Sequence, residues 1–346
     1  MKVRLYQCGL KTERCQTQYP LGLGYLKANA PASAEVEIVQ DAAALTNCDL
    51  VGLSSGAASL REAVDILKQL NGRIPVVIGG QGTLWEGLQA FPFKHIVIGE
   101  GEQAFADIVT GTASDAQVLH YPGVKNLDDL QPPVRGRCGD RVPIFTSRGC
   151  PYSCRYCSGH TFWPRVRFHS AERVLAEVQQ IAIDYPASKM IAIFDDLLIA
   201  HKARFEKIYT GWMAAGLEKR FSLRGFVRAD LFTHDMARKM KRMGFIWVRF
   251  GAESGSDRVL KLLGKGETVA DHCHAIEAAQ AAGLPIKASF MYDIPGETAE
   301  DREATKQFIE KYKGILDVMG QYKFQPFPGT AFWDGRSPLT ERMVVR

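Results

Sequence analysis

The chain has 346 residues, which is long for one ordinary domain and suits two. Hydrophobic residues make up 46% of the sequence and charged residues 23%, which excludes a disordered, collagen-like or coiled-coil protein. The net charge of +5 is spread along the chain rather than gathered in a tail, so it predicts no polyanionic partner, although it does not exclude nucleic acid.

The first seven residues alternate apolar and polar side chains, which predicts a strand rather than a targeting segment. No run approaches the roughly 18 apolar residues of a membrane span. The eight cysteines are scattered apart from one trio, which favours metal ligands or core residues over disulfides. We therefore expect a cytoplasmic chain with no membrane span.

Short apolar runs alternate with helix-like segments through residues 1–110. After the initial strand, the runs that predict strands are 36–39, 50–53, 76–78 and 96–98. Apolar strands with helices between them form parallel sheets covered on both faces, so we expect a five-stranded, doubly wound domain of the Rossmann or flavodoxin type. Within it, Ser59 and Glu62 have the spacing of a capping box at a helix start, and Asn71-Gly72 predicts the end of that helix.

Periodicity disappears in residues 111–140, where Pro and Gly accumulate, and this predicts a linker. Strands and helices then alternate again, with strands predicted at 142–146, 190–194, 222–227, 247–250, 286–291 and 318–324. Six such pairs predict an α/β domain over residues 141–330, a partial (β/α)6 TIM barrel whose site lies at the carboxyl ends of its strands. A short tail, 331–346, follows.

The most informative segment places Cys150, Cys154 and Cys157 in one loop after the first strand of the second half. A cubane iron–sulfur cluster takes soft sulfur ligands at four irons, so three thiolates leave one iron open to a substrate. A zinc site with His160 as the fourth ligand is the rival, but such sites normally bring ligands from two separated pairs. Three unligated core cysteines fit the polar loop poorly.

The pattern C-x3-C-x-aromatic-C, with Tyr156 as the aromatic residue, resembles the radical S-adenosylmethionine (SAM) superfamily. This resemblance implies that the three cysteines bind a [4Fe–4S] cluster whose open iron chelates SAM. It further implies that an electron from the cluster cleaves SAM to a 5′-deoxyadenosyl radical, and that an external donor of the flavodoxin or ferredoxin type supplies the electron.

Further residues lie at predicted strand ends, where the resemblance implies contacts with SAM. The implied contacts are the methionine ammonium with Asp195 or Asp196, its carboxylate with Arg228, the ribose with Glu253, and the adenine with Pro295 and Gly296. Each residue also has a simpler interpretation, as a helix cap, an ion pair or a turn. Their shared position at strand ends favours the cofactor site.

Two other groups of residues have weaker patterns. His272, Cys273 and His274 are adjacent on a predicted helix and point in different directions, so we expect a helix surface rather than a metal site. The aromatic and basic side chains of residues 162–169 could stack a base or hold a phosphate, although in similar proteins such a stretch is often a clamp within the fold.

The first half resembles the cobalamin-binding domain that precedes many radical SAM enzymes, and residues 126–133 resemble the usual linker. The expected corrinoid site is a glycine-rich crevice at the switch point of the sheet, lined by Ser54, Ser55, Gly79, Gly80 and Gly82. The chain departs from the family pattern after the second strand, because residues 40–45 contain no Asp-x-His-x-x-Gly. No histidine is therefore expected to ligate cobalt.

The resemblance implies a radical SAM enzyme that modifies an unactivated carbon, with cobalamin-dependent methyl transfer to a small molecule as the first hypothesis. The missing histidine and the short tail favour a second hypothesis, a cobalamin-free rearrangement or isomerisation of a small molecule or modified nucleobase. A non-catalytic sensor that binds a corrinoid or SAM without turnover is the hypothesis from another class. The sequence does not identify the substrate.

Overall fold

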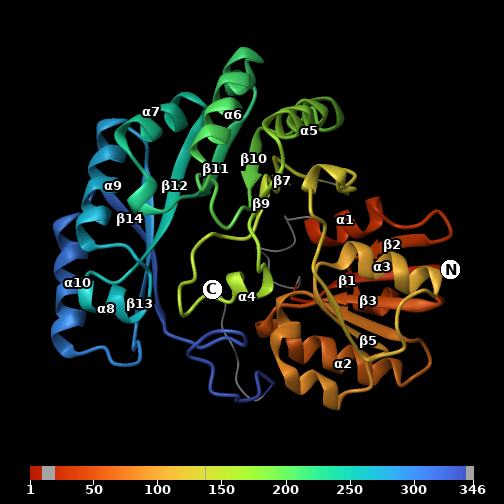
Figure 1. The fold of residues 1–346 in the computed structure, drawn as a ribbon. Helices are drawn as coiled ribbons and strands as arrows, with labels where there is room; N and C mark the ends of the chain where they lie inside the picture. Colours follow the sequence, from red (N-terminus) through yellow and green to blue (C-terminus); the bar gives the residue numbers. More distant parts are fainter. Residues whose placement is uncertain (10–19, 137, 340–346) are drawn as a thin grey trace. The chain divides into compact units, whose positions relative to one another are not determined.

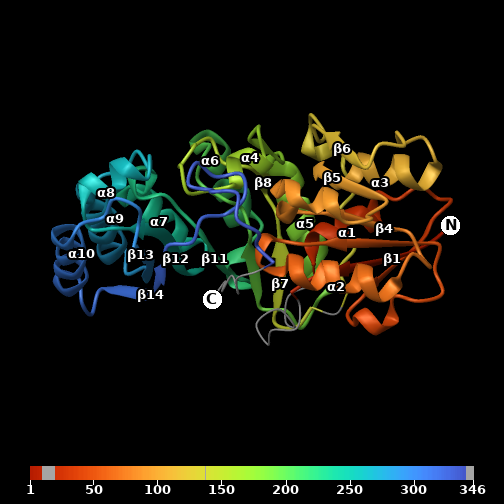
Figure 2. The ribbon, with the colours of Figure 1, turned by 90° about the horizontal axis from the view of Figure 1, so that it is seen from below.

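A computed structural model describes residues 1–9, 20–136 and 138–339 of the chain (Figures 1 and 2). It divides into two compact units: Met1–Cys138 together with the segment from Phe327 onward, and Gly139–Pro326. In the tail predicted at 331–346, Leu339 packs against the core of the first unit, and residues 340–346 lie outside the described residues.

The first unit contains a parallel sheet with strand order β2-β1-β3-β4-β5-β6. Its strands are β1 (Lys2–Gln7), β2 (Glu35–Val39), β3 (Leu50–Ser54), β4 (Val76–Gly79), β5 (His95–Gly99) and β6 (Val118–Tyr121). Its α-helices are α1 (Leu21–Ala28), α2 (Leu60–Leu70) and α3 (Gly101–Thr110). Residues of α2 pack into one core cluster and residues of α1 and α3 into another, so both faces of the sheet are covered, as the apolar strands predicted.

The sheet has six strands rather than the five that we predicted. The additional strand, β6, lies inside the segment interpreted as a linker and pairs with β5. The predicted capping box at the start of α2 is also absent: the Ser59 hydroxyl contacts that of Ser55 at 2.9 Å, and the Glu62 carboxylate accepts a hydrogen bond of 2.7 Å from the Tyr6 hydroxyl. The end of α2 is as predicted, with Asn71 in the left-handed region at φ 46°.

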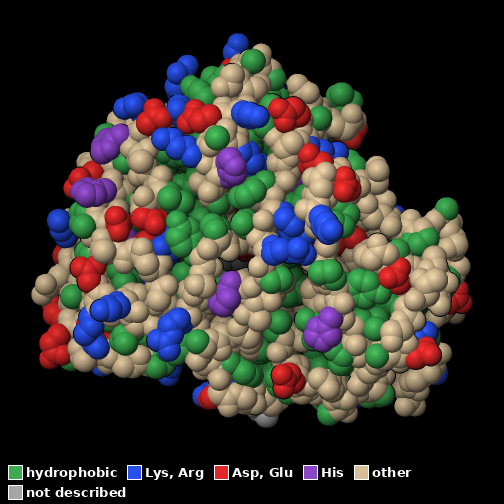
Figure 3. All heavy atoms as spheres, in the orientation of Figure 1, with side chains coloured by type: hydrophobic (Ala, Val, Ile, Leu, Met, Phe, Trp, Pro, Cys, Tyr) green, Lys and Arg blue, Asp and Glu red, His purple; other side chains and the backbone are tan. Residues whose placement is uncertain are grey.

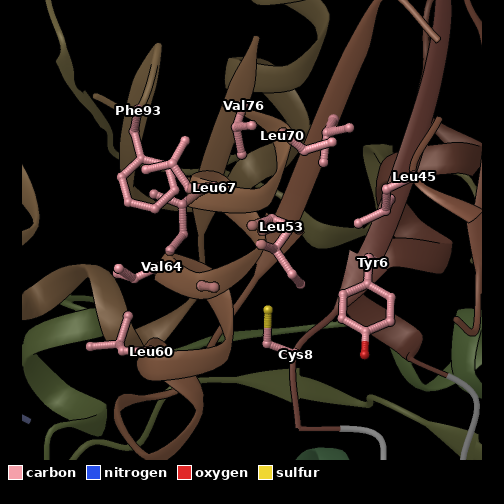
Figure 4. Packing of buried hydrophobic residues seen from close by; sticks show 14 of the residues in the cluster. Tyr6, Cys8, Leu45, Leu53, Leu60, Val64, Leu67, Leu70, Val76 and Phe93 are labelled. Atoms are coloured by element: carbon pink, nitrogen blue, oxygen red, sulfur yellow. The ribbon is translucent and has the colours of Figure 1, made fainter. Parts of the chain in front are cut away.

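The core on the α2 side of this sheet is built from aliphatic side chains around the end of β1. Figure 4 shows Cys8 facing Leu53 and Val64, with Tyr6 beside them. Cys8 is 4% exposed, and burial raises the pKa of its thiol far above the ordinary value. This cysteine therefore behaves as a small core residue, not as a nucleophile.

The second unit contains a six-stranded parallel sheet in the order β14-β13-β12-β11-β10-β7. Its strands are β7 (Arg141–Ile144), β10 (Met190–Ile193), β11 (Ser222–Phe226), β12 (Phe245–Glu253), β13 (Ile286–Tyr292) and β14 (Leu316–Lys323), and a short antiparallel pair joins β8 (Ser147–Arg148) to β9 (Arg167–Phe168). All six strands predicted for this half are present, and their order is that of an open partial barrel.

The helices of the second unit follow the strands in alternation. They are α4 (Gly159–Phe162), α5 (Ala171–Asp184), α6 (Lys202–Ala214), α7 (His234–Arg242), α8 (Asp257–Leu262), α9 (Val269–Ala281) and α10 (Ala299–Lys311). Figure 1 shows α6, α7, α9 and α10 along the outer side of the sheet. Parallel strands joined by right-handed crossovers place their helices on one face, so the other face is the inner face of the partial barrel.

The described part of the chain contains no helix that combines the length and apolar character needed to cross a membrane. On the face drawn in Figure 3, Lys and Arg side chains are interspersed with Asp and Glu. The moderate positive charge of the sequence is therefore not gathered into one basic surface on that face.

Gly80, directly after β4, provides a test of how tightly the first unit is packed. It has φ 91°, and a Cβ atom there would lie 2.7 Å from the Ser55 carbonyl oxygen. We expect Gly80→Ala to lower the free energy of unfolding by about 2 kcal/mol or more, because it adds both left-handed strain and a backbone clash. The matched control is Gly79→Ala, whose Cβ would meet no atom within 4 Å. Equal melting temperatures of the two variants by circular dichroism would contradict this account.

Candidate active site at the carboxyl edge of the barrel

The three cysteines lie in the loop between β8 and α4, and none forms a disulfide. The backbone N–H of Gly159 points to the Cys157 sulfur at 3.3 Å, and the N–H of Cys157 closes a turn onto the Cys154 carbonyl at 3.0 Å. Burial raises the pKa of Cys157 to about 11 and also raises that of Cys150. Without a bound metal, the cysteines of this loop are therefore protonated thiols, and metal binding releases their protons.

The three cysteines and His160 are not gathered around one point in the structure. Within the residues that the structure describes, no three His, Cys, Asp or Glu side chains are close enough together to hold one ion.

Asp195 and Asp196, which follow β10, differ sharply in their surroundings. The Asp195 carboxylate is 2% exposed and accepts hydrogen bonds from the backbone and hydroxyl groups of both Thr146 and Ser147, including 2.6 Å from the Thr146 N–H and 2.8 Å from the Ser147 hydroxyl. These four bonds hold the segment that leads from β7 to the cysteine loop. Asp195 is therefore a structural carboxylate with little capacity left for a ligand.

Asp196 is the carboxylate that remains available. Its side chain is exposed, and its charge contributes to the raised pKa values of Cys150 and Cys157. Partial burial and the neighbouring charge of Asp195 raise its own pKa, while the backbone N–H of Gly149 opposes that shift. Asp196 thus lies beside the cysteine loop with its charge facing the sulfurs.

Arg228 is buried at the end of β11, 6% exposed, and already has partners within the chain. Its Nε lies 2.9 Å from the Asp230 carboxylate and 3.6 Å from that of Glu267. Its guanidinium lies 3.6 Å above the Tyr152 ring, and one nitrogen is 4.0 Å from the Cys154 sulfur. The structure therefore places Arg228 against the cysteine loop, with its charge neutralised by two carboxylates.

Glu253 ends β12 in an unusual backbone conformation, with φ 63° at a register shift between β12 and β13. Its carboxylate folds back over Gly251, where a Cβ atom would lie 2.0 Å from it, and accepts a hydrogen bond of 3.0 Å from the Tyr156 hydroxyl. The Lys265 ammonium lies 3.7 Å from the same carboxylate oxygen. A non-glycine residue in this region stores strain that commonly marks a functional position.

Lys265 and Glu267 were not among the residues that the sequence singled out. Both are nearly buried, and the Lys265 ammonium lies 3.2 Å from the Glu267 carboxylate and 3.4 Å from the Tyr156 hydroxyl. Burial alone would raise the pKa of Glu267, but a hydrogen bond from His272 and the charges of Lys265 and Arg228 lower it to about 2. One signal in the sequence was available: both residues alternate with glycines just before the capping box of α9.

Our expectation for His272 was wrong in one respect. We expected a helix surface, but the His272 side chain is 0% exposed and lies in the core. Its Nε2 lies 3.3 Å from the Glu267 carboxylate, and its ring packs against Phe250 and Phe308 at centroid distances of 5.3 and 6.1 Å. Adjacent helical residues diverge, so one of the trio can point into the core.

The remaining predicted contacts lie in loops. Pro295 and Gly296 follow β13 on an exposed turn, in which the Gly296 carbonyl accepts a hydrogen bond of 2.7 Å from Arg258. In the stretch 162–169, Phe162 packs edge-on against Trp163, and Arg204 lies 5.3 Å from the Phe168 ring centroid. These contacts favour the interpretation of that stretch as a clamp within the fold.

In the first unit, the residues expected around a corrinoid line the end of β3 and β4. The Ser55 hydroxyl is turned inward to the Gly56 carbonyl at 2.9 Å. Gly80 and Gly82 allow neighbouring parts of this unit to pack closely. A Cβ atom at Gly80 would lie 2.7 Å from the Ser55 carbonyl oxygen, and one at Gly82 would lie 2.7 Å from the Leu60 side chain. Ser54 is partly exposed, and Gly79 faces open space. Gly80 and Gly82 are thus required for packing whether or not a ligand binds.

Comparisons with known proteins identify the class of this chain. The model of the radical SAM superfamily matches residues 144–309. A relative from Pyrococcus horikoshii, described as an uncharacterized methyltransferase, is 30% identical over 363 aligned positions, which cover 91% of this chain and 78% of the relative. The chain therefore belongs to the radical SAM superfamily, whose members use a [4Fe–4S] cluster and SAM, and it is a radical SAM enzyme.

Among solved structures, the chain is similar to the radical SAM methyltransferase TsrM from Kitasatospora setae, with a TM-score of 0.76 and 16% identity over 95% of this chain and 74% of TsrM. It is also similar to the cobalamin-dependent radical SAM enzyme OxsB, with a TM-score of 0.74 and 19% identity over 92% of this chain and 53% of OxsB. These likenesses show the fold, a Rossmann-like domain followed by a partial barrel. This chain spans only 57 to 66% of the length of three further curated relatives, which are 23 to 28% identical to it.

The buried pairing around Glu267 gives a testable stability effect. We expect Glu267→Gln to lower the free energy of unfolding by about 3 kcal/mol at pH 7, because it leaves Lys265 and Arg228 with one carboxylate partner fewer. The folded-state pKa of about 2 is below the ordinary value of 4.5, so the contribution is fully present above pH 4.5 and is lost as the pH falls toward 2.

Urea-unfolding midpoints from pH 7 to pH 3 measure this effect. The gap between the wild type and Glu267→Gln should be constant above about pH 5 and should narrow below it. The control is Glu303→Gln in the exposed pair with Lys306, which should change the midpoint little at any pH. A gap that does not depend on pH would refute the assigned role of the Glu267 charge.

Proposed function

We propose that this enzyme binds a [4Fe–4S] cluster through Cys150, Cys154 and Cys157 and uses it to cleave SAM reductively. The observation that carries the proposal is the placement of three free thiols on one loop at the carboxyl edge of a partial barrel. The donor set fits, because soft thiolates suit iron–sulfur clusters and the Gly159 N–H supplies a hydrogen bond to one sulfur. When bound, the cluster would supply one electron to the sulfonium of SAM, which breaks the bond between sulfur and C5′ and gives methionine and a 5′-deoxyadenosyl radical.

The side chains around the loop suggest a division of roles toward SAM. Asp196 is free to accept hydrogen bonds from the methionine ammonium, whereas Asp195 positions the loop. Glu253, which accepts a hydrogen bond from Tyr156 of the cysteine loop, is the proposed acceptor for the ribose hydroxyls. The exposed turn at Pro295 and Gly296 is the proposed support for the adenine.

Arg228 has a different proposed role from the one that the sequence suggested. Because Asp230 and Glu267 already neutralise it, we assign it to the cysteine loop, where it donates toward the Cys154 sulfur. The neighbouring Lys265 is buried as well and already has two carboxylate partners, Glu253 and Glu267, so we assign neither cation to the methionine carboxylate.

The reaction proposed for the radical is methyl transfer to an unactivated carbon of a small molecule, with cobalamin held by the first unit. Support comes from the methyltransferase description of the Pyrococcus relative and from the fold shared with TsrM and OxsB, whose structures contain cobalamin. The proposed corrinoid contacts are those of the open side of the crevice, Ser54 and Gly79.

A second candidate is a rearrangement or isomerisation without cobalamin. It is favoured by the inward-turned Ser55 and by the use of Gly80 and Gly82 for packing, which leave fewer of the expected contacts for a corrinoid. Under either reaction we propose an external flavodoxin- or ferredoxin-type electron donor.

The cluster assignment is tested by anaerobic reconstitution with iron and sulfide. We expect the wild type to bind about four irons and turn brown, and each of Cys150→Ala, Cys154→Ala and Cys157→Ala to lose the visible absorption, because two thiolates do not retain a cubane. Cys273→Ala is the control, since this cysteine lies on α9 away from the loop, and it should bind iron normally. A colourless wild type with one zinc per chain would end the proposal.

The reductive cleavage is tested on the same reconstituted enzyme by measuring 5′-deoxyadenosine after addition of dithionite and SAM. Slow formation is expected even without substrate. A loaded, reduced enzyme that binds SAM and yields none, with or without candidate substrates, would favour a non-catalytic sensor.

The corrinoid assignment is tested by incubating the chain with hydroxocobalamin and recording the visible spectrum after gel filtration. We expect about one cobalamin to be retained, with cobalt lacking a protein histidine ligand, because no Asp-x-His-x-x-Gly follows β2. Gly79→Val should reduce retention by filling the open side of the crevice. An enzyme that retains no cobalamin but still forms 5′-deoxyadenosine would establish the second candidate instead.

A further inference from the structure

The inner face of the barrel sheet carries a row of alternating basic and aromatic side chains that the proposed function does not use. Arg224 on β11 pairs in register with Trp247 on β12, and Lys287 on β13 pairs in register with Arg249, two residues further along β12. The Trp247 ring lies 5.5 Å from the Arg224 guanidinium and 5.5 Å from the Lys287 ammonium, so two cations flank one indole.

A second row lies nearer the carboxyl edge. There the Arg249 guanidinium is 5.4 Å from the Phe226 ring and donates a hydrogen bond to the Ser289 hydroxyl. Phe226 is 36% exposed.

The charges of this face are incompletely balanced. Lys287 pairs with the exposed Asp317, but no carboxylate in the described part of the chain pairs with Arg224 or Arg249. Burial and the nearby charge of Arg141 lower the pKa of Arg224. Removing a guanidinium group from water without an anionic partner lowers the stability of the fold. Proteins keep such destabilising groups mainly at functional sites, where a bound ligand supplies the missing negative charge.

We propose that this inner face binds a phosphate or diphosphate group of the enzyme's substrate, with Arg224 and Arg249 as the ligands of its oxygens and Lys287 as an additional cation. The proposal rests on the proposed function, because it takes the barrel interior to be the substrate site. Guanidinium groups match phosphate oxygens in pairs, and two unpaired guanidiniums suit a dianion better than a single carboxylate.

The position of the two rows also bears on the shape of the substrate. Arg249 precedes Glu253 by four residues on β12, which corresponds to roughly 13 Å along a strand. An anion bound at Arg249 therefore leaves room for a chain or ring system of several bonds before the carbon that reaches the carboxyl edge. A terminal phosphate on a small molecule suits two half-buried guanidinium groups better than a phosphodiester of a polynucleotide, which carries one charge per group and is usually bound along an exposed basic surface.

Titration calorimetry with inorganic diphosphate on the full-length, cluster-loaded chain tests the proposal. We expect saturable binding of one diphosphate, weakened at least tenfold in Arg224→Gln and in Arg249→Gln. Arg238→Gln, which removes an exposed cation of α7, is the matched control and should bind as the wild type does. Unchanged circular dichroism and iron content in each variant exclude misfolding and loss of the cluster as explanations for weaker binding.

Several outcomes would overturn the proposal. These are the absence of diphosphate binding at millimolar concentration, equal binding by all four proteins, preference for a dicarboxylate such as succinate over diphosphate, and tight binding of single-stranded RNA that diphosphate does not displace. Formation of 5′-deoxyadenosine in the same preparation separates this proposal from the function itself: cleavage without diphosphate binding refutes only the anion site, and diphosphate binding without cleavage refutes only the radical chemistry.

Discussion

One buried carboxylate, that of Glu267, holds together the segments that form the candidate active site. Its oxygens contact the backbone N–H of Ala229 after β11, the ammonium of Lys265 in the preceding loop and the ring of His272 within α9. Removing a carboxylate from water costs several kcal/mol unless charged or polar partners replace the water. The strand end, the loop and the helix must therefore pack together around this carboxylate. Lys265 also donates a hydrogen bond to the Tyr156 hydroxyl, which links the same cluster to the cysteine loop.

The fold was largely predictable because most strands of both units are continuous apolar runs, whose burial on two faces is visible in the sequence itself. β6 was missed because it is a four-residue edge strand in which only Leu119 is buried, between a polar segment and Pro122. The capping box failed for a different reason. Glu62 has the right spacing from Ser59, but its carboxylate is taken by Tyr6 and Gly9, which are more than 50 residues away.

The candidate site was predictable only where its residues are close in sequence. Three cysteines within eight positions define a ligand set by spacing alone, whereas the partners of Arg228 and Glu253 are set by how strand ends meet. The sequence places Asp195 and Asp196 as equals. Packing distinguishes them, because only Asp195 points back toward the strand end at Thr146. Charge and position along a strand therefore identify candidates, and burial decides which of them a ligand can reach.

The balance of charge changes along the inside of the barrel. At the cysteine edge four carboxylates, those of Asp196, Asp230, Glu253 and Glu267, outnumber the cations Arg228 and Lys265, while Arg224 and Arg249 stand further down the inner face. SAM is a sulfonium cation, so the carboxylates of the cysteine edge attract it. The proposed substrate carries a phosphate anion, so Arg224 and Arg249 attract it and the carboxylates repel it. At about 10 Å and an effective dielectric constant of about 20, one misplaced charge costs about 1.7 kcal/mol. The charge pattern would thus orient a substrate with its phosphate away from the radical and its reacting carbon toward it.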